Sequence, residues 1–363
     1  MPAKYKKRAD GRYLTQITVG IKEDGRPKYK NIYAKTIREL EEKAAAFKQE
    51  LEKGIIVDDD GLTVAAWARK WLEVYKHGRE YNTMESYNGT INTHIIPALG
   101  HYKLRDLKAH HIQEMINERA AAGLTRTLEL ITGALNQMLK QAIKNEYIYK
   151  NAAADIVLPK IDKPKKRSLT EQEKAQVTSA DLDDKAKAFV FMLLYTGVRR
   201  GEALALTTND IDLENKTIEI NKNLIFVGNR PVIKNSPKTD AGNRIIPIPD
   251  VLYNLLIKYL PTLQNIFIFP SAKNVPMSES AFRRFWEKII IILNLPADDI
   301  TPHIFRHTYA TTLYYAGIDV KTAQYLLGHA SIRITLDIYT HLEAENNSES
   351  AKKLNSYINK IAQ

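Results

Sequence analysis

Four short blocks in the second half of the chain carry residue types that can handle a phosphate together. The blocks are TGVRRGE at 196–202, SPKTDAGNR at 236–244, HIFRH at 303–307, and LGH at 327–329 with IYT at 338–340. Arginine suits a phosphate because its planar fork donates two parallel hydrogen bonds to two oxygens. The spacing predicts that Arg199 begins a helix after Gly197, with Glu202 one turn along to brace it. His303 and Arg306, at i and i+3, are predicted to share one helix face.

In this order and spacing the blocks resemble the tyrosine recombinase, or phage integrase, family. The family pattern is TG-x-R-x-GE, PKT, H-x-x-R-H, LGH and a tyrosine ten residues later, and it covers about 165–345 of this chain. Each motif alone is weak, but five in order make a specific signal. The departures are Ile304-Phe305, where the family often has Asp-Leu, and Val198, where Leu or Met is common; neither position supplies a reacting group.

The resemblance implies a complete set of catalytic side chains, with Glu202 in support. The set is Arg199, Lys238, His303, Arg306, His329 and Tyr339. Two arginines suit the charge that develops on the non-bridging oxygens when a phosphodiester breaks. A tyrosine with a pKa of about 10 needs a base, for which His303 is the candidate, and Lys238 can protonate the leaving 5′ oxygen. Lys234, four residues earlier in the same hairpin region, stays open as an alternative acid.

The expected reaction needs neither metal nor ATP. The arginines supply the positive charge that Mg²⁺ supplies in other phosphoryl transfers, so we expect no metal and no other cofactor. A covalent 3′-phosphotyrosine conserves the bond energy until a 5′ hydroxyl reverses the step. His307 is expected to support the site or the core rather than to react, and Tyr314, Tyr315 and Tyr325 are expected to pack in the core or on the surface.

The composition agrees with a DNA partner. The chain has 363 residues, 44% of them apolar, and 53 Lys and Arg against 42 Asp and Glu, a net charge of +11. This length predicts two or three domains, and the surplus of positive charge favours nucleic acid over a merely solvated basic surface. The absence of cysteine excludes disulfides, Cys-ligated zinc, iron–sulfur clusters and thiol catalysis. Neither a membrane span nor a secretory signal is recognisable, so we expect a cytoplasmic protein without membrane association.

The positive charge is concentrated near the N-terminus. Nine basic and three acidic residues among the first thirty contribute +6 of the +11. The candidate DNA-binding side chains are Lys4, Lys6, Lys7, Arg8, Arg12, Lys28 and Lys30, together with Lys165, Lys166 and Arg167 in the stretch PKIDKPKKR at 159–167. That stretch is predicted to be an extended linker that tracks phosphates, with a purely solubilising linker as the alternative.

The pattern of residues predicts the elements that must carry these side chains. Asp-Gly pairs at 10–11 and 24–25 predict tight hairpin turns between strands near 3–8, 12–20 and 27–33. A capping box at Thr36 and Glu39 then opens a helix to about residue 53. Such basic strands can enter a major groove, although a solvated sheet is the alternative.

A linker at 54–62 leads into a purely helical stretch from 63 to about 151. Apolar residues at Val64, Trp67 and Trp71 follow helical spacing and are expected to form core. Asn82 is expected to cap a second helix that Pro97 closes, and two more helices are predicted near 108–121 and 125–146. This makes a four-helix domain.

The last part is predicted to mix helices with a β-hairpin. A capping box at Thr170 and Glu173 opens it, and the further predictions are helices near 184–195 and 200–206, a hairpin region at 216–248, and four or five helices to the end. Ser331 is expected to cap the helix of Tyr339, which should end near that residue. The apolar positions of the tail to Gln363 suit a helix. By the resemblance this helix packs on a neighbouring protomer, and packing on its own domain is the alternative.

The sequence thus predicts an α+β, mainly α-helical protein. Its expected parts are a small three-stranded sheet with one helix at 1–53, a helical SAM-like domain at 63–158, and a mixed helix and β-hairpin catalytic domain at 165–363. By resemblance to integrases of temperate phages and conjugative transposons, these would bind arm sites, bind core sites and cut DNA.

The expected function is site-specific recombination at attachment sites, as a homotetramer on core and arm DNA, that integrates and excises a mobile element or prophage. A DNA-bending host factor and an excisionase are possible further partners by the same resemblance. The alternatives are a chromosome-dimer resolvase, which lacks the arm-binding domain, and a silent DNA-binding regulator, against which the intact six-residue set argues.

Overall fold

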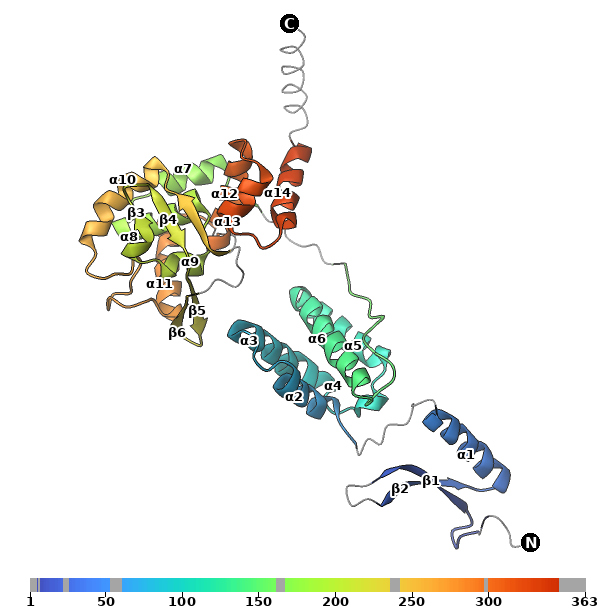
Figure 1. Cartoon of the computed structure of the whole chain (residues 1–363). Helices are drawn as coiled ribbons and strands as arrows, with labels where there is room; N and C mark the ends of the chain where they lie inside the picture. Colours follow the sequence, from blue (N-terminus) through green and yellow to red (C-terminus); the bar gives the residue numbers. More distant parts are fainter. Residues whose placement is uncertain are drawn as a thin grey trace. The chain divides into compact units, whose positions relative to one another are not determined.

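The computed structural model describes residues 5, 7–21, 26–52, 61–160, 167–235, 242–296 and 300–345. The chain divides into two units, residues 1–163 and 164–363 (Figure 1). Helices dominate both units, and the strands among the described residues form three small antiparallel sheets, which confirms the predicted α+β, mainly helical class. The finer division into three domains remains a prediction.

The N-terminal sheet has two strands in the described part of the chain. β1 (Tyr13–Ile21) and β2 (Pro27–Ala34) pair antiparallel, with a register shift between Thr18 and Gly20. The helix α1 (Ile37–Glu52) packs against them, and Ile17, Ala34 and Leu40 form the buried contact. Thr36 accepts a hydrogen bond from the Glu39 backbone N–H at 3.2 Å, so the predicted cap is confirmed.

The third strand expected near 3–8 does not form over the described residues. Lys7 makes only an isolated bridge with Tyr13. Asp10 accepts hydrogen bonds from the backbone N–H and the guanidinium of Arg12, and this local bonding competes with a strand ladder. Only Gly11 of the first Asp-Gly pair has a positive φ, at 78°, so the expected type I′ turn is also absent there. The second pair lies outside the described residues.

The helical part of the first unit follows the predicted order. Its elements are α2 (Val64–Tyr75), α3 (Tyr81–Thr90), the π-turn η1 (Ile91–Ile95), α4 (Ile96–Leu99), the 3₁₀ turn η2 (Leu104–Asp106), α5 (Ala109–Ala121) and α6 (Thr125–Lys144). Val64, Trp67 and Trp71 are buried, as expected, and the Trp67 indole donates to the Met138 carbonyl at 3.1 Å. This core holds α2, α3, α5 and α6 together.

Two predicted boundaries in this part were wrong. Asn82 does not cap α3, because the helix begins one residue earlier, at Tyr81. Pro97 does not close the helix. It lies in the first turn of α4, where a missing backbone N–H costs no hydrogen bond, and the chain stays helical to Leu99.

The second unit wraps helices around small sheets. Its helices are α7 (Glu171–Ser179), α8 (Asp184–Thr196), α9 (Arg200–Ala205), α10 (Asp250–Tyr259), α11 (Glu279–Leu293), α12 (Pro302–Tyr315), α13 (Val320–Leu327) and α14 (Ile332–Glu345), with 3₁₀ turns η3 (Thr208–Asp210) and η5 (Leu260–Thr262). The strands β3 (Ile211–Asp212), β4 (Thr217–Ile220) and β7 (Arg244–Pro247) form one sheet, and β5 (Asn223–Val227) with β6 (Arg230–Lys234) forms a hairpin. The nearly all-buried helix α8 is central to the core.

Several helix ends in this unit position the candidate site. Thr170 and Glu173 form the predicted capping box of α7. α8 ends at Gly197 and α13 at Gly328, both left-handed with φ near 62° and 63°, a conformation that glycine adopts without strain. α14 does not end near Tyr339 but continues to Glu345; the tail after it lies outside the described residues. No described helix is both long and apolar enough to cross a membrane.

Candidate active site

Arg199 stands at the junction of α8 and α9, as its motif predicted. Its backbone N–H donates to Glu202 Oε2 at 2.9 Å, and its guanidinium donates to Glu202 Oε1 at 2.6 Å and to the Gly328 carbonyl at 2.7 Å. The side chain is 42% exposed. Arg199 is therefore held by its backbone N–H and by its guanidinium, while part of the side chain stays exposed.

Arg306 lies on α12 and is buried, with 4% of its surface exposed. Its guanidinium donates to the Gly197 carbonyl at 2.9 Å and to the Leu327 carbonyl. Burial, and then the neighbouring charge of Arg199, lowers the pKa of Arg306 to about 9. It stays protonated at pH 7, so the site keeps a buried cation.

The C-terminal end of α13 gathers three guanidiniums. The carbonyls of Leu326, Leu327 and Gly328 accept hydrogen bonds from Arg244, Arg306 and Arg199, respectively. The last carbonyls of a helix lack partners within the helix and carry its negative dipole end, so they attract cations. We call the three arginines, with Glu202, the arginine cluster.

Glu202 joins two of these arginines, and Arg244 is a residue of the site that the motif analysis missed. The Glu202 carboxylate accepts from Arg244 Nη2 at 2.8 Å and from Arg199. Burial alone would raise the pKa of Glu202, but Arg244 and then Arg199 outweigh it and lower the pKa to about 2. One signal for Arg244 was available: strand alternation places it on the same buried face as Ile246.

His329 follows the glycine that ends α13, next to the arginine cluster. It is buried, and its Nδ1 lies 2.8 Å from the Thr335 hydroxyl on α14. Burial first, and then the charges of Arg306 and Arg199, lowers the pKa of His329 to about 3. The imidazole is therefore neutral at pH 7 and can donate a hydrogen bond from one of its two nitrogens.

Tyr339 lies on α14 in a different environment. It is 4% exposed and belongs to an apolar cluster formed by Tyr309, Ala310, Leu313, Ala323, Leu327 and Tyr339. Its hydroxyl donates to the Ile318 carbonyl at 3.2 Å, and its ring meets the edge of Tyr314 at 5.2 Å. Burial first, and then Asp319, raises the pKa of Tyr339 to about 12. The hydroxyl is thus neutral and bonded to backbone.

The two remaining catalytic candidates are less fully placed. His303 is exposed on α12, one turn before Arg306, and its ring lies 4.7 Å from that of His307. Lys238 lies outside the described residues, whereas the alternative Lys234 ends β6 and is half-buried. Among the described side chains, no three His, Asp or Glu residues gather as ligands for a metal ion.

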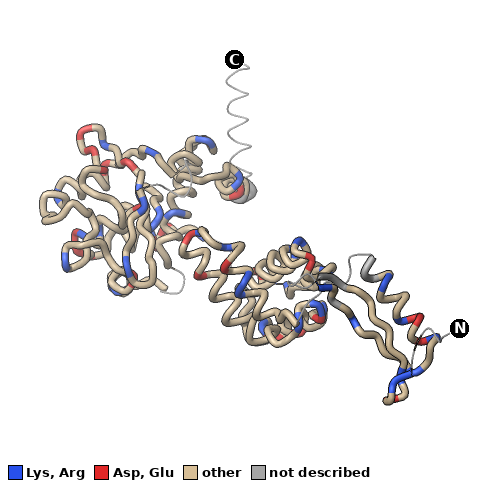
Figure 2. Tube along the Cα trace, turned by 60° about the horizontal axis from the view of Figure 1, so that its bottom comes forward, with Lys and Arg blue, Asp and Glu red and all other residues tan. Residues whose placement is uncertain are grey.

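The candidate DNA-binding residues of the N-terminal part are exposed where they are described. Lys7, Arg8, Arg12 and Lys30 all face solvent, and Figure 2 marks the basic positions along the chain. The guanidiniums of Arg8 and Arg12 lie 5.7 and 5.1 Å from the Tyr33 ring. Lys4, Lys6, Lys165 and Lys166 lie outside the described residues, as does the Lys28 side chain.

Arg167 has a structural partner. Its guanidinium donates to both Glu173 oxygens, at 2.7 and 2.9 Å, and so joins the capping box of α7. The side chain is still 36% exposed. A role at phosphates would compete with this ion pair.

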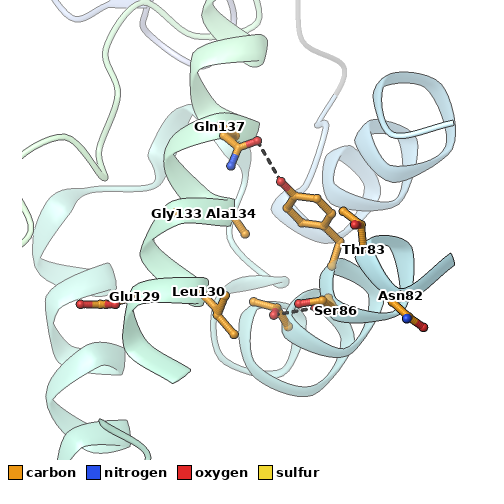
Figure 3. A pocket seen from close by; sticks show the side chains of 10 residues that line it. Asn82, Thr83, Ser86, Glu129, Leu130, Gly133, Ala134 and Gln137 are labelled. Carbon is orange, nitrogen blue, oxygen red and sulfur yellow. Dashed lines mark hydrogen bonds between the residues drawn. The ribbon is translucent and has the colours of Figure 1, made fainter. Parts of the chain in front are cut away.

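A groove of about 490 Å³ lies between α3 and α6 (Figure 3). Uncharged polar side chains line much of it, including Asn82, Thr83, Ser86 and Gln137. Gln137 Oε1 accepts hydrogen bonds from the Tyr87 hydroxyl at 3.0 Å and from Lys76 at 2.8 Å, which fixes the amide. The Lys76 ammonium itself lies 4.5 Å from the ring centres of both Trp71 and Tyr87.

Family models match most of the chain. Residues 167–346 match the phage integrase family, and residues 63–119 match the phage integrase N-terminal SAM-like domain. The chain is 27% identical to a tyrosine recombinase XerC-like protein of Caldanaerobacter subterraneus subsp. tengcongensis, over 97% of each chain. It is 26% identical to the transposase of transposon Tn916 from Enterococcus faecalis, over 87% of this chain and 83% of that protein.

Solved structures show the same fold. The integrase of transposon Tn1549 in complex with transposon right end DNA matches with a TM-score of 0.70 at 24% identity, over 81% of this chain and 100% of that one. A lambda integrase tetramer bound to a Holliday junction matches with a TM-score of 0.61 at 21% identity, over 91% of this chain and 96% of that one.

Proposed function

The chain belongs to the phage integrase family of tyrosine recombinases and is a tyrosine-type site-specific recombinase, and from this premise we propose that it integrates and excises a mobile element. The observation that carries the proposal is the convergence of Arg199, Arg306 and His329 at the end of α13. Tyr339 is on the next helix. Together they supply charge, a neutral hydrogen-bond donor and a nucleophile for one phosphodiester.

In this proposal the arginines bind the two non-bridging oxygens of the scissile phosphate. Each of Arg199 and Arg306 uses two N–H groups on partners within the described residues, which leaves three for a phosphate. The charge on these oxygens increases in the transition state, and fixed cations in a buried site stabilise it strongly. His329, held by Thr335, donates to one of the same oxygens.

Tyr339 attacks the phosphorus in the proposed reaction. The bond from its hydroxyl oxygen to phosphorus forms as the bond from phosphorus to the 5′ oxygen breaks. His303 takes the tyrosine proton, and Lys238 gives a proton to the leaving oxygen. A 5′ hydroxyl from a second duplex then reverses these steps. Because the hydroxyl is bonded to Ile318 in the described conformation, it must leave that carbonyl before it attacks.

The proposed DNA partners are core and arm sites. The divisions at 1–53, 63–158 and 165–363 would bind arm DNA, bind core DNA and catalyse cleavage. A homotetramer on two core sites is proposed because a related integrase was solved as a tetramer bound to a Holliday junction. A DNA-bending host factor and an excisionase would assist in such a complex.

Integration is favoured over chromosome-dimer resolution by residues 1–53. This basic segment matches what an arm-binding domain needs, and the Tn916 transposase aligns with 87% of the chain. Resolution is the second candidate, because one relative over 97% of the chain is named XerC-like. Deleting residues 1–53 discriminates between them. An integrase should keep cleavage of an isolated core site but lose recombination between full attachment sites, whereas a resolvase should keep both.

The covalent step is tested with Tyr339→Phe on a nicked duplex that traps the intermediate. The variant should bind this duplex as wild type does, yet give no protein–DNA adduct on a denaturing gel. A normal yield of adduct would remove Tyr339 as the nucleophile. Repeating wild-type cleavage in the presence of a chelator should leave the yield unchanged.

A further inference from the structure

Arg244 and Glu202 form a buried ion pair behind Arg199. The Arg244 side chain is 0% exposed and that of Glu202 is 4% exposed. Arg244 donates twice to the Glu202 carboxylate, once to the Leu326 carbonyl at 2.9 Å and once to the Gly242 carbonyl at 3.1 Å. Four of its five N–H groups are thus used inside the protein. Arg244 has no surface to offer to DNA, so any effect on cleavage must pass through its neighbours.

The charges of the cluster do not cancel. Arg199, Arg244 and Arg306 contribute three positive charges and Glu202 one negative charge, which leaves two in excess. A phosphodiester carries one negative charge, and the second develops during attack. If Arg244 were neutral, Glu202 would balance Arg199 instead, and the excess would fall to one.

Position decides which cation faces the substrate. Arg199 is 42% exposed, whereas Arg244, on β7, is buried against α9 and the end of α13. Glu202 lies between the two and accepts hydrogen bonds from both. The buried arginine can therefore satisfy the carboxylate from behind, while Arg199 presents its remaining donors outward.

We propose that Arg244 is a positioning residue for DNA cleavage, which neutralises Glu202 so that Arg199 keeps its full positive charge toward the scissile phosphate. The inference rests on the proposed binding of that phosphate by Arg199. Packing alone would not explain the pair, because an apolar pair of similar volume avoids the cost of desolvating two charges. An apolar pair would lack the carboxylate that accepts hydrogen bonds from the backbone N–H and the guanidinium of Arg199.

The test is a charge-compensation series measured by single-turnover cleavage of a nicked core duplex. Arg244→Met should slow cleavage by roughly 10²-fold, as the loss of one preorganised electrostatic contact does. DNA affinity, measured separately, should change by less than about threefold, because Arg244 does not reach DNA. Adding Glu202→Gln to Arg244→Met restores the excess of two charges and should recover at least about tenfold of the rate. A purely structural role predicts instead that the rate follows the thermal stability of each variant, so cleavage is measured well below every unfolding midpoint.

Four outcomes decide the inference. If the double variant folds, as judged by thermal unfolding, and is no faster than Arg244→Met, the inference is overturned. If Arg244→Met does not fold, the double variant, which buries no unpaired charge, must still cleave within about tenfold of wild type. If Arg199→Met is slow while Arg244→Met is fast, only this inference fails. If Arg199→Met cleaves as wild type does, the proposed phosphate-binding role fails and this inference with it.

Discussion

Arg306 and Tyr339 are both buried in the second unit, yet they are held in opposite ways. Arg306 is fixed by carbonyls at two helix ends, and every partner in the arginine cluster is polar or charged. Tyr339 lies among Tyr309, Leu313 and Leu327, with one hydrogen bond of 3.2 Å to Ile318. The first region resists rearrangement because each N–H that moves leaves a buried carbonyl unpaired. Movement of Tyr339, in contrast, costs only one weak hydrogen bond and some apolar contact.

In the proposed mechanism, this difference separates the two tasks of the site. Stabilisation of phosphate charge needs donors that are in place before the substrate arrives, since reorganisation would cost part of their benefit. A nucleophile needs only to arrive, and a hydroxyl with a pKa raised to about 12 is inert until its surroundings change. We infer that the arginine cluster is ready for DNA, whereas Tyr339 must be released.

The largest expected effect concerns the proton for the leaving 5′ oxygen, which neither the arginine cluster nor Tyr339 supplies in the proposed reaction. Lys238→Ala should slow cleavage roughly 10²–10⁴-fold, the usual span for a general acid. In a duplex with sulfur at the 5′ bridging position, the leaving sulfur departs as a thiolate and needs no proton. Lys238→Ala should cleave this duplex nearly as fast as wild type in the same gel assay.

Lys234→Ala is the matched control, four residues away on β6. If sulfur rescues Lys234→Ala and not Lys238→Ala, the acid is Lys234. If sulfur rescues neither variant, the hairpin lysine only positions phosphate, and another group such as His303 protonates the oxygen.

The next effect tests the fixed region directly. Arg306→Met should slow cleavage about 10²–10³-fold, because it removes a buried cation that the proposal places on a non-bridging oxygen. Sulfur at the bridging position should not rescue it, since the defect is in charge stabilisation. The measurement is the ratio of rates on the oxygen and sulfur duplexes. A full rescue would assign Arg306 to proton transfer and would contradict the contrast drawn between Arg306 and Tyr339.

The sequence predicted best what is local in the chain. The bracing of Arg199 by Glu202 at i+3 and the caps at Thr36 and Thr170 follow from a few adjacent residues. Arg244 was missed because its carboxylate partner is 42 residues away, and its burial depends on how β7 meets α13.

Two other outcomes depended on three-dimensional packing. The Tyr339 helix continued past its expected end to Glu345, and the Tyr339 side chain joined an apolar cluster built from α12, α13 and α14. Pro97 does not end the helix, because the π-helical segment η1 shifts the backbone hydrogen-bond register just before it and places it in the first turn of α4. Neither the cluster under Tyr339 nor that register shift is written in a short motif, and the roles of the six catalytic candidates remain predictions.

A smaller effect appears in the pH dependence of stability. The folded-state pKa of His329 is about 3, below its ordinary 6.5. Between these values the unfolded chain binds more protons than the folded chain, so the free energy of unfolding falls as the pH is lowered from about 6.5 toward 3. His329→Gln should make thermal unfolding less dependent on pH in this window. An unchanged slope between pH 7 and pH 5 would contradict the burial of a neutral imidazole.

The smallest effect tests how weakly Tyr339 is held. Tyr339→Phe removes only the hydroxyl that donates to Ile318 and keeps the ring in the apolar cluster. The free energy of unfolding should therefore fall by about 0.5–1.5 kcal/mol, the net value of one ordinary hydrogen bond. Tyr315→Phe, at a tyrosine of α12 that is 60% exposed, is the matched control and should change the free energy of unfolding by less than about 0.5 kcal/mol. Denaturant unfolding at pH 7 measures both. A fall of more than about 3 kcal/mol in the free energy of unfolding would contradict the comparison. It would mean that moving the Tyr339 hydroxyl costs as much as moving an arginine of the cluster.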